Sequence, residues 1–113
     1  MSGLTTHVLD TMHGRPAAGM SLRLLRGAET LVATVTNLDG RLDRPLLAGS
    51  ALRAGGYRLE FDVGEYFRDM GVPLSQPSFL ETVVVDFSVD EPESHYHVPL
   101  LVSPFAYSTY RGS

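Results

Sequence analysis

The sequence contains no cysteine, no tryptophan and no lysine among its 113 residues. The absence of cysteine excludes a disulfide scaffold, a thiolate metal site and a cysteine nucleophile. The absence of lysine excludes Schiff-base chemistry and a phosphate-binding P-loop, both of which require a lysine amine. All nine basic residues are therefore arginines.

Long apolar runs and clustered positive charge are also missing. No apolar stretch approaches the roughly 18 to 20 residues that span a bilayer, so we expect no membrane partner. The formal net charge of -4 argues against a nucleic-acid partner, because proteins that follow a phosphate backbone carry clustered basic residues. The first ten residues carry no basic or apolar leader, which predicts a cytoplasmic location. We expect residues 1–113 to form a single domain.

Short alternating or β-branched runs recur about every ten residues, bounded by Gly, Pro, Asn and Asp, which is typical of an all-β sandwich or barrel. Residues 65–70 carry apolar side chains at helical spacing and are followed by Gly71, which predicts one short helix at Glu65–Met70. The eight predicted strands are Leu4–Thr11, Met20–Arg26, Leu31–Thr36, a short strand opened by Arg41, Tyr57–Val63, Phe79–Val89, Ser94–Val102, and Phe105 to about Tyr110.

Alternation along the predicted strand Ser94–Val102 separates its histidines from its apolar side chains. Tyr96, Val98, Leu100 and Val102 share one face, so His95 and His97 point the other way. In the first strand, His7 faces outward if Val8 faces the core. His7 and His97 therefore share the outer face with the apolar residues Leu9, Pro99 and Leu101. An outer face this apolar predicts cover by another subunit or a cavity lining.

Three interpretations of the histidines stay open. His95 and His97 fit a pair of hydrogen-bonded surface or interface residues, and this is the commoner situation. With His7 as a third ligand they also fit a catalytic zinc site, because three histidines around an open position is a known zinc geometry. Metal-free acid–base catalysis is the third, since histidine titrates near neutral pH. His13 lies in a Gly/Pro turn, where we expect it to be solvated.

Two further features are candidates for ligand binding. Arg41 follows the turn Asn37–Gly40 and is either an exposed strand-edge residue or a planar donor group for an anionic or carbonyl-rich ligand. The sequence ends on the polar and aromatic cluster Ser108–Ser113, which is either a polar last strand or part of a site. The acidic residues are scattered and show no paired-carboxylate pattern.

Three blocks of the sequence resemble the transthyretin-related family. The most specific is the last, in which residues 95–101 lead into residues 107–113 with a Tyr-Arg-Gly-Ser end typical of the family's hydrolase branch. The hormone-carrying branch has Lys in place of His7, Glu in place of Arg41 and Thr in place of His97. The blocks are Thr6–Asp10 with Gly14–Pro16, Asp39–Arg41, and His95–Leu101 with Tyr107–Ser113.

The resemblance implies a fold and an assembly. The fold is a transthyretin-like sandwich of two four-stranded antiparallel sheets with one short helix, in which strands one, four, seven and eight share a sheet. The assembly is a homotetramer, a dimer of dimers, with the outer face of that sheet lining a channel between the dimers. In the family this channel accounts for Leu9, Pro99 and Leu101 being exposed in one protomer.

The resemblance also implies an activity, namely hydrolytic ring opening of 5-hydroxyisourate in urate breakdown, with no cofactor and no metal. The implied alternative is a non-catalytic carrier that binds an aromatic ligand in the channel. The implied catalytic residues are His7, Arg41, His97 and Ser113, and the implied substrate-binding residues are His7, Arg41, Tyr110, Arg111 and Gly112.

Overall fold

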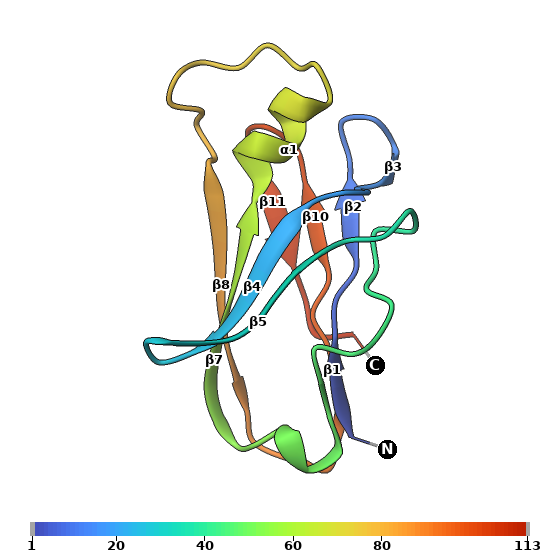
Figure 1. The fold of residues 1–113 in the computed structure, drawn as a ribbon, viewed down its shortest axis with the longest axis vertical. Coiled ribbons are helices and arrows are strands. Elements are labelled where there is room, and N and C mark those ends of the chain that lie inside the picture. Colours follow the sequence, from blue (N-terminus) through green and yellow to red (C-terminus); the bar gives the residue numbers. More distant parts are fainter. Residues whose placement is uncertain (1, 113) are drawn as a thin grey trace.

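The computed structural model describes residues 2–112 of the chain. The molecule is elongated, 43 × 27 × 20 Å along its principal axes, and its strands form two layers that enclose the core (Figure 1). The core consists of apolar side chains from both layers together with Phe67 of the helix. The predicted all-β architecture with one short α-helix is confirmed.

One layer is an antiparallel sheet with the strand order β5-β4-β7-β8. Its central strands alternate as predicted: Tyr57, Leu59 and Phe61 of β7 are buried, whereas Arg58 is exposed. A 3-10 helix at Gly49–Ala51 precedes β7. The strands are β4 (Ser21–Arg26), β5 (Glu29–Val35), β7 (Gly55–Asp62) and β8 (Thr82–Val89).

The second layer is built from two hydrogen-bonded groups of strands, with the orders β6-β1-β9 and β11-β10-β2-β3. β1 continues into β2 and β9 into β10, so the first, seventh and eighth predicted strands share one layer, together with the short strand β6. The strands are β1 (Gly3–Thr5), β2 (Val8–Asp10), β3 (Arg15–Pro16), β6 (Leu47–Ala48), β9 (His95–His97), β10 (Leu100–Val102) and β11 (Tyr107–Thr109).

In one respect this layer differs from the prediction of purely antiparallel sheets. β1 pairs in parallel with β9, and β2 in parallel with β10. Both long strands are also interrupted, at Thr6-His7 and at Val98-Pro99. Pro99 has no N–H to donate, which explains the interruption at Val98-Pro99, while the amides of Val98 and Leu100 still donate to the carbonyls of Thr5 and His7.

The predicted fourth strand is displaced. Arg41 lies in an exposed bend and does not open a strand, and the short strand of this region is β6. The cause is the turn before it. Gly40 adopts a φ of +72°, and a Cβ at this position would collide with the carbonyl oxygen of Val8, so the chain is pressed against β2. The amide of Val8 donates to the carbonyl of Gly40 at 2.8 Å, which occupies the edge that a fourth strand would need.

The helix α1 (Val63–Asp69) follows β7 directly and lies at one end of the sandwich (Figure 1). It begins two residues earlier than predicted, because Val63 is buried and continues the apolar face of the helix. Tyr66 and Phe67 bury the same face. The helix end is held to the segment before β8 by Arg68, which donates to Glu81 at 2.7 Å.

Candidate active site

The parallel pairing of β1 with β9 brings the predicted histidines to one outer face. Thr5 lies opposite His97 in the register, and His7 follows two residues further along the first strand. Tyr96, Val98 and Leu100 are buried, which confirms the predicted alternation, whereas His97 is half-buried and His95 is exposed. The face differs from the prediction at Pro99, which is buried within the protomer. Leu9 and Leu101 are half-buried.

The turn that carries Arg41 is organised by Asn37. The side-chain oxygen of Asn37 accepts hydrogen bonds from the amides of Asp39, at 2.9 Å, and Arg41, at 3.1 Å. The amide of Asn37 donates to the carbonyl of Arg41, and its side-chain nitrogen donates to Asp43. We did not assign Asn37 a role from the sequence, although an Asn that opens a turn ending in Gly is the usual signal of this geometry.

His7 is held in a single tautomer when neutral. Its Nε2 lies 2.9 Å from the carbonyl oxygen of Asp39, and a carbonyl only accepts hydrogen bonds, so Nε2 carries the proton. The lone pair of neutral His7 is therefore on Nδ1. The Asp39 carbonyl belongs to the same turn as Arg41, so this hydrogen bond ties the histidine to the loop that presents the guanidinium.

His97 is held by a hydroxyl and by the end of the chain. Its Nδ1 lies 2.8 Å from Oγ1 of Thr5, which leaves Nε2 for the site. The amide of Gly112 donates to the carbonyl of His97 at 2.7 Å, and the two residues form an isolated antiparallel bridge. A Cβ on Gly112 would lie 2.8 Å from Cδ2 of the imidazole, so only glycine allows this approach.

The charge of Arg41 acts on both imidazoles. Burial, and then the positive charge of Arg41, lower the pKa of His7 below its usual value, although the hydrogen bond to Asp39 opposes this. Burial also lowers the pKa of His97, followed by repulsion from Arg41, His7 and His95. Both effects favour the neutral form of each ring, which is the form that a general base needs.

Arg41 also lines a cavity together with Thr5, the residue that contacts His97. This cavity of about 200 Å³ is bounded by Thr5, Thr6 and residues 41–45. Among the residues that the structure describes, the Arg41 side chain has no hydrogen-bond or ion-pair partner, so its donor fork is available to a ligand. Such a fork suits carbonyl and carboxylate oxygens.

The C-terminal segment runs beside β9, to which Gly112 is joined by its bridge with His97. Tyr110 is 60% exposed, and with His95, Arg111 and Gly112 it lines an open depression. The guanidinium of Arg111 lies over the Tyr96 ring, 3.9 Å from its centroid, and donates to the carbonyl of His95 at 3.3 Å. Ser113, predicted as catalytic, lies outside the described residues.

His13 is not simply solvated, as we had expected, because it belongs to a polar cluster away from this site. Its Nδ1 and its amide both bond to the carboxylate of Asp10, at 2.6 and 2.9 Å, and the hydroxyl of Tyr66 donates to the same carboxylate at 2.8 Å. A buried carboxylate needs such partners, and Asp10 is 1% exposed. The sequence hid this contact, since Tyr66 is 56 residues from Asp10.

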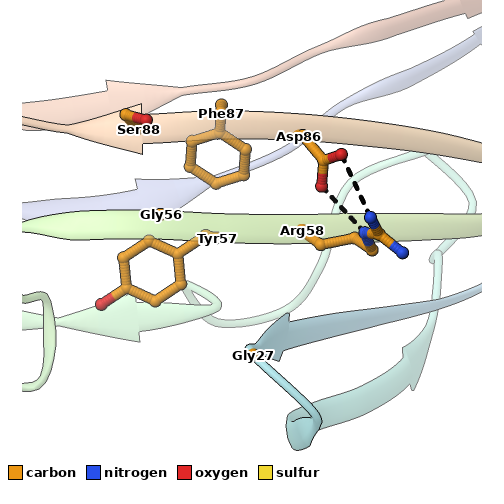
Figure 2. Close-up of a pocket in the computed structure, with 7 residues that line it drawn as sticks. All are labelled: Gly27, Gly56, Tyr57, Arg58, Asp86, Phe87 and Ser88. Carbon is orange, nitrogen blue, oxygen red and sulfur yellow. Dashed lines mark hydrogen bonds and ion pairs between the residues drawn. The ribbon is translucent and has the colours of Figure 1, made fainter.

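A second depression lies on the other layer and contains none of the predicted site residues. It lies over β7 and β8, where Gly27, Gly56 and Ser88 leave the backbone uncovered beside the ion pair of Arg58 with Asp86 (Figure 2). Within residues 2–112, no group of three or more His, Asp or Glu side chains is arranged to hold a metal ion. No helix of that part of the chain is long and apolar enough to cross a membrane.

A two-layered β-sandwich with one α-helix, and with two histidines and an arginine on the outer face of one layer, defines a transthyretin-like protein. The family model described as HIUase/Transthyretin family matches residues 4–112. The chain belongs to this family.

Relatives and solved structures agree with this assignment. The chain is 54% identical to the 5-hydroxyisourate hydrolase of Caulobacter vibrioides, over the full length of both proteins. The structure of Klebsiella pneumoniae 5-hydroxyisourate hydrolase matches with a TM-score of 0.86 and 40% identity, again over the full length of both chains. The crystal structure of (S)-allantoin synthase matches 99% of this chain with a TM-score of 0.92 and 45% identity, and this chain spans 44% of that one.

Proposed function

We propose that this protein is a 5-hydroxyisourate hydrolase, which opens the six-membered ring of its substrate to give 2-oxo-4-hydroxy-4-carboxy-5-ureidoimidazoline in urate breakdown. The observation that carries the proposal is geometric: His7 and His97 each have one ring nitrogen held by a hydrogen bond, and Arg41, whose side chain has no partner within residues 2–112, lies close enough for its charge to act on both rings. The full-length identity of 54% to a protein named for this activity supports it. In this proposal the chain acts as a single domain.

The reaction adds water to a ring carbonyl and breaks the carbon–nitrogen bond. One of His7 and His97 takes the proton of the attacking water, and the other supports the tetrahedral adduct or protonates the departing nitrogen. The nitrogens free for this work are Nδ1 of His7 and Nε2 of His97, since the other nitrogen of each ring is bonded. One positioned acid or base contributes on the order of 10²- to 10⁴-fold.

Arg41 and the C-terminal residues would hold the substrate. The guanidinium of Arg41 donates to the substrate oxygens and opposes the negative charge that grows on the adduct. The exposed ring of Tyr110 stacks on the flat substrate or reaches it through its hydroxyl. Arg111 and Gly112 border the same depression. Ser113 is assigned to the water or to a histidine, through its hydroxyl or the terminal carboxylate.

The proposed assembly is a homotetramer in which two dimers enclose this face. Leu9 and Leu101 remain half-buried and Tyr107 is 46% exposed in the protomer, which favours cover by a second copy. Sedimentation at several protein concentrations tests this. A single species with the mass of one protomer would contradict it.

A non-catalytic carrier of an aromatic ligand is the alternative function. It is not favoured, because His7, Arg41 and His97 are all present. The hormone-carrying branch of the family that the sequence resembles has Lys, Glu and Thr at these positions. Turnover separates the two functions, since a carrier binds the ligand unchanged.

The test follows freshly made 5-hydroxyisourate by its ultraviolet absorbance, with and without the protein. We expect the protein to accelerate the decay, the variant His97→Ala to lose most of this effect, and a chain that ends at Gly112 to be impaired. A decay rate that the intact protein does not change would refute the proposed activity. Normal rates in both variants would remove His97 and Ser113 from the mechanism.

A further inference from the structure

One hydroxyl group joins two imidazoles on the outer face of β1 and β9. Oγ1 of Thr5 lies 2.8 Å from Nδ1 of His97 and 3.1 Å from Nε2 of His95. A hydroxyl donates one hydrogen bond and accepts others, so Thr5 can donate to one ring while it accepts from the other. The contact with His97 frees its Nε2 for the site, whereas the contact with His95 has no role in the site described above.

The strand pairing explains why the three side chains meet. In the parallel register Thr5 lies opposite His97, and Gly3 lies opposite His95. The His95 ring lies over β1, since a Cβ on Gly3 would be 3.4 Å from its Nδ1, an ordinary van der Waals contact. The rings of His95 and His97 thus reach the Thr5 hydroxyl from the same strand.

The environments of the two rings differ, and the difference favours transfer of a proton from His97 to His95. His97 is half-buried next to Arg41 and His7, whereas His95 is exposed to solvent. The charged and titratable groups that act on His97 are Arg41, His7 and His95, and all of them carry or can gain positive charge. A proton held on His97 is therefore disfavoured, and His95 is the ring of the pair that is open to solvent.

Within residues 2–112, His7 has no comparable link. Its bonded nitrogen donates to the carbonyl of Asp39, and a carbonyl cannot pass a proton on. When His7 takes a proton it must keep the charge, beside Arg41. His97 is the histidine of the pair whose second nitrogen contacts a group that both donates and accepts.

We propose that Thr5 is a positioning residue that orients the His97 ring and links it to His95, which exchanges the proton with solvent. The proposal rests on the proposed hydrolysis and assigns the path of its protons. As Nε2 of His97 takes a proton from the attacking water, its Nδ1 proton passes to Thr5, and the hydroxyl proton of Thr5 passes to Nε2 of His95. His97 ends neutral, Thr5 is unchanged, and His95 carries the charge.

The same path runs in reverse when the ring opens. Nε2 of His97 gives its proton to the departing nitrogen, Thr5 gives its hydroxyl proton to Nδ1 of His97, and His95 returns a proton to Thr5. All three groups are then as they were at the start. This arrangement avoids an imidazolium beside Arg41 in either half of the reaction.

Thr5→Val tests the hydroxyl, because valine keeps the branched shape and removes the oxygen. We expect kcat for 5-hydroxyisourate to fall on the order of 10- to 100-fold with KM within about twofold, since the substrate contacts remain. Thr5→Ser should restore most of the rate. The control is Thr30→Val, on an exposed position of β5 in the other layer, which should have no effect. A normal kcat in Thr5→Val would overturn the proposal.

His95→Gln separates proton transfer from positioning. Glutamine can still contact Thr5 but cannot carry the proton, so we expect a lower kcat that added imidazole restores. If His95→Gln keeps the full rate, the link to solvent is wrong. A loss of rate that imidazole does not restore would likewise contradict proton exchange through His95.

A substrate-free measurement keeps this proposal apart from the proposed function. Nitrogen NMR measures how the neutral His97 ring divides between its two tautomers. In Thr5→Val this ratio should differ from that in the wild-type protein, because the hydrogen bond to Nδ1 is lost. The neutral His7 ring should remain protonated on Nε2 in both proteins. An unchanged His97 spectrum in Thr5→Val refutes the positioning role. Failure of the intact protein to hydrolyse 5-hydroxyisourate refutes the activity and the proton path that rests on it.

Discussion

The backbone of Gly112 lies against the imidazole of His97, so closely that a Cβ on Gly112 would be 2.8 Å from Cδ2 of the ring. The same glycine donates its amide to the His97 carbonyl at 2.7 Å. The end of the chain thereby becomes one wall of the candidate site. A side chain at this position has to displace either the ring or the chain end.

Gly112→Ala should accordingly reduce hydrolysis of 5-hydroxyisourate without unfolding the protein. We expect kcat/KM to fall on the order of 10²-fold, the scale of a misplacement of about 1 Å at a reacting group. The melting temperature should change little, because residues 110 and 111 are exposed and Gly112 joins the sheet only through its isolated bridge with His97. Kinetics and thermal melting on the same samples check both expectations.

Gly56→Ala is the matched control for this variant. A Cβ on Gly56 would meet nothing within 4 Å, and the residue lies on the other layer, in the depression of Figure 2. This variant should keep the wild-type rate. Equal rates in both alanine variants would show that the contact between Gly112 and His97 is not needed for catalysis.

Arg41→Gln should raise the pKa of both His7 and His97. The positive charge of Arg41 lowers both values in the wild-type protein, so its removal lets each ring bind a proton more readily. Proton NMR titration of the two rings measures this without substrate, and Arg53→Gln, at the exposed Arg53, is the control. Hydrolysis should fall on the order of 10²- to 10³-fold if the guanidinium also stabilises the adduct. Unchanged titrations would show that Arg41 does not act on the histidines.

The rate of hydrolysis should be nearly constant through neutral pH and fall only in acid. Both histidines have pKa values lowered from 6.5, so the neutral, base-competent forms persist below that pH and are lost as each ring is protonated. The acid limb of log kcat/KM against pH should therefore lie below 6.5. A limb above 6.5 would contradict neutral histidines as the working groups.

A feature of the site can be predicted from the sequence when neighbouring residues determine it, and is missed when it depends on residues far apart in the chain. The outward direction of His7 and His97 follows from strand alternation, which is local, and it was predicted correctly. The positive φ of Gly40 also follows from its turn. The parallel pairing of β1 with β9 was missed, because it joins segments about 90 residues apart and leaves no mark on either strand.

Contacts made by single polar atoms were the least predictable. Thr5 looks like any threonine in a strand until the register places it between His95 and His97. Pro99 was predicted on the outer face by alternation, but the strand breaks at this residue and its side chain is buried. The alternation rule fails there because it assumes an uninterrupted strand.

Metal removal tests the zinc interpretation of the three histidines. We expect dialysis against a strong chelator to leave hydrolysis unchanged, because proton transfer and charge stabilisation are already assigned to His7, His97 and Arg41. Activity is measured before dialysis, after it, and after zinc is added back. Loss of turnover on chelation, with recovery on adding zinc, would show that the metal-free mechanism is wrong.

Asp10→Asn should destabilise the fold more than it affects the site. The Asp10 carboxylate is buried and accepts hydrogen bonds from the amide and ring of His13 and from the hydroxyl of Tyr66 on α1. An asparagine replaces one acceptor oxygen with an NH2 group that faces these donors. The free energy of unfolding should drop by about 1 to 3 kcal/mol, the usual cost of leaving a buried polar group unsatisfied.

Denaturant unfolding of Asp10→Asn measures this cost. The control is Asp69→Asn, because Asp69 is an exposed aspartate on the same helix that carries Tyr66. Acid should have a related effect on the wild-type protein. Burial would raise the pKa of Asp10, but the hydrogen bonds from His13 and Tyr66 outweigh it and lower the pKa. The stabilisation is therefore complete above the usual aspartate value of 3.8 and is lost as the pH falls below it. If Asp10→Asn and Asp69→Asn unfold at the same denaturant concentration, the hydrogen bonds of Asp10 do not hold α1 to β2.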